Sequence, residues 1–475
     1  MSNKSSLLPQ DHIVDESSLR YMLKLASPAA ITTVSFTLMQ FVDQYMVSRL
    51  GTDALAAIGP AQFVSFLPSG FAIGAMASLN TFVSQSLGRG DKKSCSNYFW
   101  QTMYMGFTYF LVVLAVMLPT APSIFKIMGQ EGIVAQMEVT YLSIMLYAHI
   151  LAVINWSANQ FFMGIHRPII TMCASLCGQV VNVTANYVLI FGKLGFPAMG
   201  IAGAAWGTFV GIGVAALVNM VIFLSGRMNL VFHTRRSLKI NFGRMYDLLK
   251  VGLPAGLGLS VNVAFWGMIL YGLVGIFGKE AQAATTAVFN WTRFSVMPVV
   301  GISMALSAAV GKSIGAGKKE LAARQTSICL KVALLFMGLA GICFFVFREW
   351  LIGFWSRDYK VMEAGMSILV CAAFYQVFHA ARIIYGGSLR GAGDTVWLML
   401  VSSIGAVVIL GIGGTIMVVF FPMAGPIGPW LAASLSIAVA GLANWWRFKS
   451  NKWMKIDLFK RRAVGVPVET QAVVE

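Results

Sequence analysis

Twelve long runs of apolar residues, nearly free of charge, follow one another along the 475-residue chain. A run of about 20 apolar residues is long enough to cross the hydrocarbon core of a bilayer as a helix. The pattern therefore predicts an all-α polytopic membrane protein with twelve transmembrane helices. The expected spans are residues 25–48, 55–86, 97–120, 138–160, 168–191, 200–226, 250–275, 283–311, 327–347, 362–387, 396–420 and 427–446.

Proline residues mark the places where three of these spans are expected to bend. The spans 55–86 and 283–311 are unusually long and contain Pro68 and Pro298, so we expect a tilt or a kink in both. In the first span, Pro28 and its small neighbours offer another place where the helix can bend.

The second half of the chain repeats the first at a nearly constant offset of 226 or 227 residues. The matching stretches are 22–30 with 248–256, 86–93 with 313–320, and 162–168 with 389–395. Six spans per repeat is an even number, so both halves have the same orientation. This predicts two six-helix lobes related by a pseudo-two-fold axis along the membrane normal. The expected parts are an N-terminal segment 1–24, an N-lobe 25–226, a basic linker 227–249, a C-lobe 250–446 and a tail 447–475.

Composition and charge support a membrane protein and orient it. The chain is 57% hydrophobic and only 11% charged, whereas a soluble domain carries about 25% charged residues. Of the 35 basic residues, 25 fall in the two ends and in the alternate loops that lie on the same side of the membrane as these ends. Basic residues are enriched in cytoplasmic loops, so both termini are predicted to be cytoplasmic in the cell (inner) membrane. The net charge of +17 then indicates contact with anionic lipid, not with nucleic acid. Residues 1–20 are polar, so no cleavable signal peptide is expected.

One carboxylate, Asp43, stands inside a predicted span, whereas the other acidic residues fall at span ends, in loops or in the tails. A charged Asp at membrane depth costs at least about 2.5 kcal/mol. Asp43 is therefore expected to hold a proton, a metal cation or a cationic substrate. The alternative is an Asp near the lipid headgroups that is tied to Arg49 or to a backbone amide.

The sequence also disfavours other classes of membrane protein. We find no metal-ligand cluster, no nucleophile motif and no paired acids at span depth, so an enzyme is not expected. A channel is disfavoured because no pore ring or filter-like segment occurs.

Several motifs occur in order along nearly the whole chain. They are FVDQYMVSRLGTDALAAIG (41–59), the loops SLGRGDKK (86–93) and SIGAGKKE (313–320), NVTANYVLIFG (182–192), GIAGAAWGT (200–208) and SLRGAGDT (388–395). Taken together, they resemble the multidrug and toxic compound extrusion (MATE) family. The resemblance implies a two-lobed exporter that moves drugs or metabolites outward against inward H⁺ or Na⁺.

In the N-lobe, the resemblance places the family's cation or proton site on Asp43, Asn182, Asn186 and Thr208. The two Asn residues are one helical turn apart, and amide and hydroxyl oxygens suit a hard cation beside one carboxylate, so a monovalent cation is a candidate ligand. The alternative for the Asn pair is hydrogen bonding between helices. Some branches of the family carry a second carboxylate at the position of Asn186, and its absence leaves proton storage to Asp43 alone.

In the C-lobe, the chain departs from the family pattern. Two positions that are acidic in other branches are Asn262 and His379 here, so these are the candidate C-lobe coupling residues and a carboxylate Na⁺ site is not expected. His379 is either a titrating group or a neutral packing residue, with Gln376 and Arg382 each three residues away. Arg293 and Arg382 either line the cavity or extend toward the membrane surface.

Aromatic residues suit planar, lipophilic and often cationic substrates through stacking and cation–π contact, although they also fill helix interfaces. We expect such small molecules and membrane lipid as partners. We also expect the protein to be a monomer. The candidate cavity residues are Tyr187, Trp206, Trp266, Trp291 and Tyr375.

The sequence thus predicts a cation-coupled antiporter that exports drugs or metabolites by alternating access. We expect coupling to H⁺ and no cofactor, because one negative charge compensates the dehydration of Na⁺ poorly, whereas protonation removes the charge itself. Three alternatives remain: coupling to Na⁺, a dedicated exporter of one secondary metabolite, and a flippase for a lipid-linked substrate.

Overall fold

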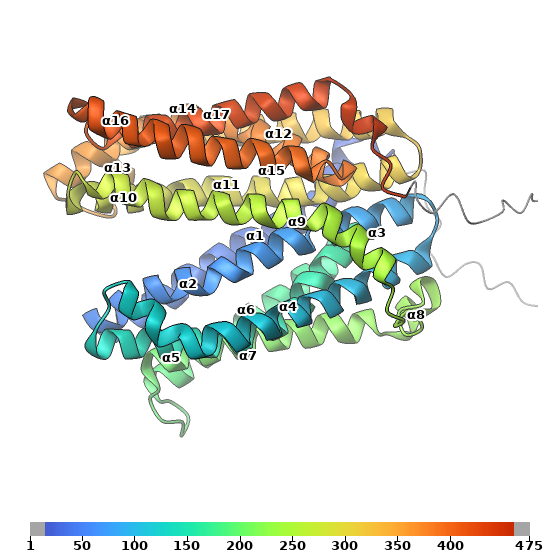
Figure 1. Ribbon diagram of the computed structural model, residues 1–475, viewed down its shortest axis with the longest axis horizontal. Helices are drawn as coiled ribbons and strands as arrows, with labels where there is room; N and C mark the ends of the chain where they lie inside the picture. Colours follow the sequence, from blue (N-terminus) through green and yellow to red (C-terminus); the bar gives the residue numbers. More distant parts are fainter. Residues whose placement is uncertain (1–14, 460–475) are drawn as a thin grey trace, which may run out of the picture.

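A computed structural model of the chain describes residues 15–459, apart from the side chains of residues 52 and 268–271. Within these residues the protein is helical without strands, and twelve helices are long and apolar enough to cross a membrane. They form two groups that lie side by side (Figure 1). The predicted all-α, two-lobed fold is confirmed. The predictions for residues 1–14 and 460–475 lie outside the described residues.

The N-lobe is formed by the first six membrane-spanning helices, one of which is divided in two. They are α1 (Leu19–Ser48), α2 (Thr52–Met76) with α3 (Ser78–Gly88), α4 (Lys92–Ile127), α5 (Gly132–Gly164), α6 (Pro168–Phe191) and α7 (Gly200–Phe223). The short helix α8 (Gly226–Phe232) follows, in the segment where the sequence predicts a linker.

The C-lobe repeats this order, with π-helical turns in two of its spans. The spans are α9 (Phe242–Ala264) with η1 (Phe265–Leu270) and α10 (Tyr271–Gly275), α11 (Lys279–Gly315), α12 (Lys319–Val346), α14 (Tyr359–Ala392), α15 (Thr395–Ile404) with η2 (Gly405–Gly413) and α16 (Gly414–Phe420), and α17 (Ile427–Lys449). Short turns connect them: α13 (Arg348–Gly353), η3 (Pro422–Ala424) and η4 (Lys452–Lys455).

The prolines of the first, second and eighth spans lie inside helices that continue past them, and the tilt or kink expected there stays a prediction. The second span is divided at Ala77, nine residues beyond Pro68, and Pro298 lies inside the continuous helix α11. In the first span, Pro28 likewise lies inside continuous α1, where the hydroxyl of Thr32 donates to the Pro28 carbonyl at 2.8 Å. A proline that keeps helical φ costs one backbone hydrogen bond, and this cost does not require a break.

Both described chain ends lie at one end of the bundle (Figure 1). We call this end the terminal face and the opposite end the distal face. The terminal face includes the turns at residues 89–91, 165–167, 233–241, 316–318 and 393–394, and the distal face includes those at 49–51, 128–131, 192–199, 276–278 and 421–426.

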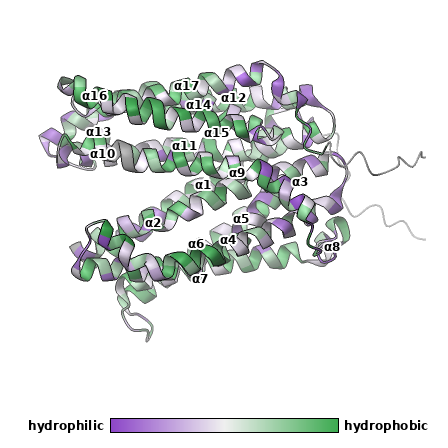
Figure 2. Cartoon of the chain, viewed as in Figure 1, coloured by the Kyte–Doolittle hydropathy of each residue, from purple (hydrophilic) through white to green (hydrophobic). Residues whose placement is uncertain are grey.

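Hydrophobic residues predominate along the helices, and hydrophilic residues are most frequent near the two ends of the bundle (Figure 2). On α12, for example, the exposed residues Leu335, Leu339 and Ile342 follow the spacing of one helix face. An unbroken apolar face of this kind suits a lipid environment and would be unfavourable in water.

The two lobes pack closely along glycines that are equivalent in the internal repeat. A Cβ added to Gly301 of α11 would lie 2.5 Å from the Cα of Ala30, and one added to its repeat partner Gly74 would lie 2.7 Å from the carbonyl oxygen of Ala255. Small residues allow helix backbones to approach in this way. The repeat therefore places the same close contact on both sides of the lobe interface.

Each lobe also buries the beginning of the other lobe's first helix. Met22, Leu25 and Ala29 of α1 belong to the apolar core formed by α11, α12 and α14. Conversely, Leu248 and Val251 of α9 belong to the core formed by α3, α4 and α5. These segments are the repeated stretches 22–30 and 248–256, so the exchange follows the internal repeat.

Candidate functional site

Asp43 lies on α1, with only 8% of its surface exposed. Its carboxylate faces α6, where the Nδ2 of Asn186 donates to Oδ1 of Asp43 at 2.6 Å. Arg49, the alternative partner, donates to the hydroxyl of Tyr45 at 3.3 Å, and Asp43 has no ion pair with any described residue. The carboxylate is therefore buried without a basic partner.

The other two predicted residues extend this contact to α7. The Nδ2 of Asn186 also lies 3.5 Å from Oδ1 of Asn182, and the Nδ2 of Asn182 donates to the hydroxyl of Thr208 at 3.3 Å. That hydroxyl donates to the carbonyl of Ala204 at 3.0 Å. The structure thus brings Asp43, Asn182, Asn186 and Thr208 into one chain of hydrogen bonds across three helices.

Gly207 is a part of this site that the sequence reasoning missed. A side chain at Gly207 would collide with Oδ1 of Asn186, so only glycine lets α7 approach α6 at this level. This Oδ1 is buried and has no hydrogen-bond partner among the described residues. The small residues of the stretch 200–208 were the available signal, since they predict close helix packing.

A second string of polar side chains lies near the site and was also missed. The Nε2 of Gln44 lies 3.5 Å from Oε1 of Gln62, and the Nε2 of Gln62 donates to the hydroxyl of Tyr141 at 3.4 Å. Gln44 is exposed, whereas Tyr141 is buried. Since Gln44 adjoins Asp43 in the chain, the string leads from an exposed position on α1 into the N-lobe.

The arrangement around Asp43 can hold either a proton or a hard cation. Carboxylate, amide and hydroxyl oxygens are available, and the unpartnered Oδ1 of Asn186 can accept a hydrogen bond or bind an ion. Only one of these groups carries a charge. Among the described residues, no group of three or more His, Cys, Asp or Glu could hold a metal ion, so a multi-carboxylate metal site is absent there.

The two candidate C-lobe residues are not brought together by any hydrogen bond. The ring Nε2 of His379 lies 3.4 Å from Arg382, and the ring packs against Tyr375. Gln376 instead donates to Ser295 at 2.8 Å. The carbonyl of Asn262 accepts a helical hydrogen bond from the backbone of Phe265, and its side chain forms no hydrogen bond with another described residue. His379 thus has a cationic neighbour, in contrast to the amide neighbour of Asp43.

Arg293, the other candidate arginine, faces the N-lobe. Its guanidinium, which is exposed, donates to Oε1 of the partly exposed Gln40 on α1 at 3.4 Å. On the same helix, Trp291 donates to the carbonyl of Leu351 at 2.9 Å. Trp355, which packs near Trp291, also meets Phe41 of α1 edge to face. These contacts join the lobes toward the distal face.

The five candidate cavity aromatics occupy different surroundings. Tyr375 is buried against His379, and Trp266 packs against Phe289 and Trp430 in the C-lobe. Tyr187 and Trp206 are the most exposed of the five and pair only with Phe191 and Phe209 of their own helices. Trp291 lies at the distal lobe contact already described.

Glu138 is a second buried acid that sequence reasoning placed at a span end. The helix α5 begins at Gly132, six residues earlier than the predicted span, so Glu138 falls inside the helix. It is 0% exposed, and neither carboxylate oxygen has a hydrogen-bond partner among the described residues. Asp43 differs from Glu138 because the amide of Asn186, on a neighbouring helix, donates a hydrogen bond to it.

The MatE family model matches this chain twice, at residues 28–188 and again at residues 257–421. The chain belongs to the MatE family. The two matches correspond to the two lobes, and members of this family are membrane transporters, not enzymes. This agrees with the lack of a catalytic constellation in the sequence.

Related proteins cover most of the chain. A probable multidrug resistance protein NorM of Chromobacterium violaceum is 27% identical over 438 residues, which are 89% of this chain and 92% of the relative. A probable multidrug resistance protein NorM of Thermotoga maritima is 26% identical over 452 residues, which are 93% of this chain and 95% of the relative.

Solved structures share the fold. A MATE protein crystallised with MaL6 superposes with a TM-score of 0.84 at 21% identity, covering 92% of this chain and 97% of that one. An outward-facing multidrug resistance MATE transporter of the MOP superfamily gives a TM-score of 0.84 at 20% identity, covering 93% of this chain and 97% of that one.

Proposed function

We propose that this MatE protein is an H⁺-coupled antiporter that exports lipophilic small molecules across the cytoplasmic membrane. The observation that carries the proposal is the buried carboxylate of Asp43, which accepts a hydrogen bond from the Asn186 amide and has no ion pair with any described residue. A charge in such a place is costly, and binding a proton removes that cost. The related NorM proteins, named as probable multidrug resistance proteins, support export of drugs.

A proton fits the site better than Na⁺ does. The site offers one negative charge, and the Nδ2 groups of Asn182 and Asn186 act as donors within it, so they do not point lone pairs at an ion. A Na⁺ ion bound by the carboxylate would have to displace the Nδ2 of Asn186 from Oδ1 of Asp43, and it would still be balanced by a single negative charge. Coupling to Na⁺ remains the alternative that the experiment below separates.

Coupling follows if the charge of Asp43 selects between two arrangements of α1. This helix contacts both lobes: Asn186 holds it from α6, and the hydroxyl of Thr33 donates across the interface to the carbonyl of Met297 at 2.8 Å. Protonation of Asp43 weakens the charge-assisted bond to Asn186 and changes how α1 packs. If substrate and proton favour different arrangements, antiport results.

The terminal face is proposed to be cytoplasmic, as the distribution of basic residues indicates. We expect reporter fusions or cysteine labelling to place the linker 227–249 and the tail after Arg447 both in the cytoplasm. An exported reporter at one of these two segments and a cytoplasmic reporter at the other would contradict the even number of spans.

The coupling ion is tested by measuring efflux from proteoliposomes in which the pH and Na⁺ gradients are imposed separately at a fixed membrane potential. A planar aromatic cation such as ethidium serves as the probe. We expect efflux to follow ΔpH and to move lumenal pH, with Na⁺ having no effect. Efflux that requires a Na⁺ gradient and ignores ΔpH would show that the site couples to Na⁺.

A further inference from the structure

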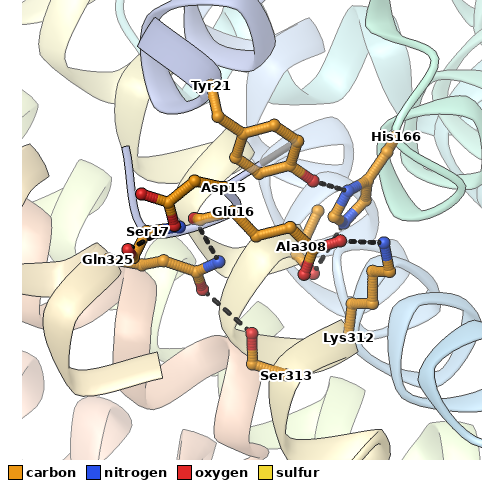
Figure 3. A network of polar contacts seen from close by, with 9 residues as sticks. All are labelled: Asp15, Glu16, Ser17, Tyr21, His166, Ala308, Lys312, Ser313 and Gln325. Atoms are coloured by element: carbon orange, nitrogen blue, oxygen red, sulfur yellow. Dashed lines mark hydrogen bonds and ion pairs between the residues drawn. The ribbon is translucent and has the colours of Figure 1, made fainter. Parts of the chain in front are cut away.

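The described N-terminal end of the chain, which leads into the N-lobe, crosses to the C-lobe at the terminal face (Figure 3). The carboxylate of Glu16 accepts a hydrogen bond from Nζ of Lys312 on α11 at 2.6 Å, and this ion pair is only partly exposed. The Glu16 carbonyl accepts from Nε2 of Gln325 on α12 at 3.2 Å. The hydroxyl of Ser313 donates to Oε1 of Gln325 at 3.0 Å. The segment before α1 is thus bonded to two C-lobe helices.

His166 joins the lobes at the same place. It lies in the turn between α5 and α6, and its Nδ1 is 2.7 Å from the hydroxyl of Tyr21 on α1. Its Nε2 is 3.2 Å from the carbonyl of Ala308 on α11. A carbonyl can only accept, so Nε2 carries the proton and Nδ1 accepts from Tyr21. Burial, together with the charge of nearby Lys312, lowers the pKa of His166 to about 4, which keeps this neutral form.

The backbone of His166 adopts a conformation that is uncommon for a residue other than glycine. Its φ is 61°, in the left-handed region that disfavours residues with a Cβ. The equivalent position of the second repeat is Gly393, with φ 88°, where glycine adopts such a conformation without strain. A strained non-glycine residue persists where surrounding contacts hold it, and it is often functional. Here the contacts that hold it reach both lobes.

The C-terminal end makes the reverse crossing, from the C-lobe to the N-lobe. After α17, Trp453 is buried against Phe448. The chain then brings Asp457 to within 3.1 Å of Arg89, which follows α3. The ring of Phe459 lies under the Arg89 guanidinium at 4.0 Å and contacts Phe82 edge to face. Each lobe is therefore held by the other lobe's chain end.

We propose that these reciprocal crossings form a clasp that holds the terminal face closed, with His166 as the positioning residue that latches α1 and the α5–α6 turn to α11. The clasp consists of Glu16, Tyr21 and His166 with Lys312 and Ala308 on one side, and of Asp457 and Phe459 with Arg89 on the other. The lobes cannot separate at this face while these bonds persist. In an alternating-access cycle the clasp must therefore release in every turnover, and this part of the inference rests on the proposed function.

The clasp is tested by hydrogen–deuterium exchange of the full-length protein in lipid nanodiscs. Three variants are compared, each of which retains a different subset of the hydrogen bonds of His166. His166→Gly removes the ring and relieves the backbone strain. Tyr21→Phe removes only the hydroxyl, and His166→Gln retains an amide able to donate to the Ala308 carbonyl. We expect the Gly and Phe variants to raise exchange in the adjoining ends of α3 and α11 by about threefold to tenfold, as loss of a buried hydrogen bond implies. The Gln variant should lie closer to wild type.

The matched control is His233→Gly. His233 is also a histidine in the left-handed region at the terminal face, with φ 55°, but it is exposed at the end of α8. This substitution should leave exchange in α3 and α11 unchanged. Unchanged exchange in both His166→Gly and Tyr21→Phe would overturn the clasp, as would an equal increase in His166→Gly and His233→Gly.

Transport provides a second measurement, which would not change if the clasp residues had only a structural role. In Tyr21→Phe, more molecules should be open at the terminal face. The KM for substrate supplied from that face should then fall by about twofold to fivefold, in proportion to the fraction of molecules that is open. Because exchange needs no substrate, it tests the clasp even if the proposed function is wrong. Increased exchange without any ethidium transport by the wild-type protein would uphold the clasp and refute the proposed function.

Discussion

Asp43→Asn should reduce gradient-driven efflux to the background of protein-free vesicles. The amide has nearly the same size as the carboxylate and can still meet Asn186, but it cannot take up a proton or carry a negative charge. Folding should be retained, because removing an unpaired buried charge lowers the cost of burial. The measurement is ethidium efflux driven by ΔpH, together with the amount and thermal stability of the purified variant.

Asp53→Asn is the matched control for this substitution. Asp53 lies in the first turn of α2 and is exposed, so the same chemical change there should leave efflux near the wild-type level. Wild-type efflux in Asp43→Asn, or an equal loss in both variants, would remove Asp43 from the coupling mechanism.

The second large effect is expected from Gly301→Ala at the lobe interface. The added Cβ would lie 2.5 Å from both the Cα and the backbone nitrogen of Ala30, so the two helices must move apart. Overpacking of this kind costs about 1–3 kcal/mol. We expect a lower thermal stability and a strongly reduced efflux rate, because the backbones of α1 and α11 are in close contact here. Gly74→Ala, the equivalent change in the other repeat, should have the same effect.

Gly338→Ala provides the comparison for the glycine variants. Gly338 lies within α12, and a Cβ at this position would meet no atom within 4 Å. Its stability and efflux should match those of the wild type. If Gly301→Ala also behaves like the wild type, the close approach of α1 and α11 is not needed for packing or transport.

Much of the fold could be predicted from the sequence because membrane spans depend on local composition. Long apolar runs determine the spans, and the repeat determines the two lobes. The break at Ala77 and the π-helical turns η1 and η2 could not be predicted, because they depend on packing against helices that are distant in the chain. The tilt or kink expected at Pro68 and Pro298 stays a prediction, since both prolines lie inside helices that continue past them.

The candidate site shows the same division. The resemblance to a family grouped Asp43 with Asn182, Asn186 and Thr208, and the structure places them in contact. Gly207 and the string of Gln44, Gln62 and Tyr141 carry no local signature, since their roles arise only when helices meet. The crossings of Glu16 and Phe459 join residues hundreds of positions apart, so no local pattern predicts them.

The central claim, that Asp43 exchanges a proton for substrate, is tested most directly by measuring proton release when ethidium binds to the purified protein in weakly buffered solution. We expect substrate binding to release protons from the wild-type protein and none from Asp43→Asn. We also expect the affinity of the wild type for ethidium to fall as the pH is lowered, because proton and substrate compete. Substrate binding without proton release at any pH, or equal release from both proteins, would contradict the central claim.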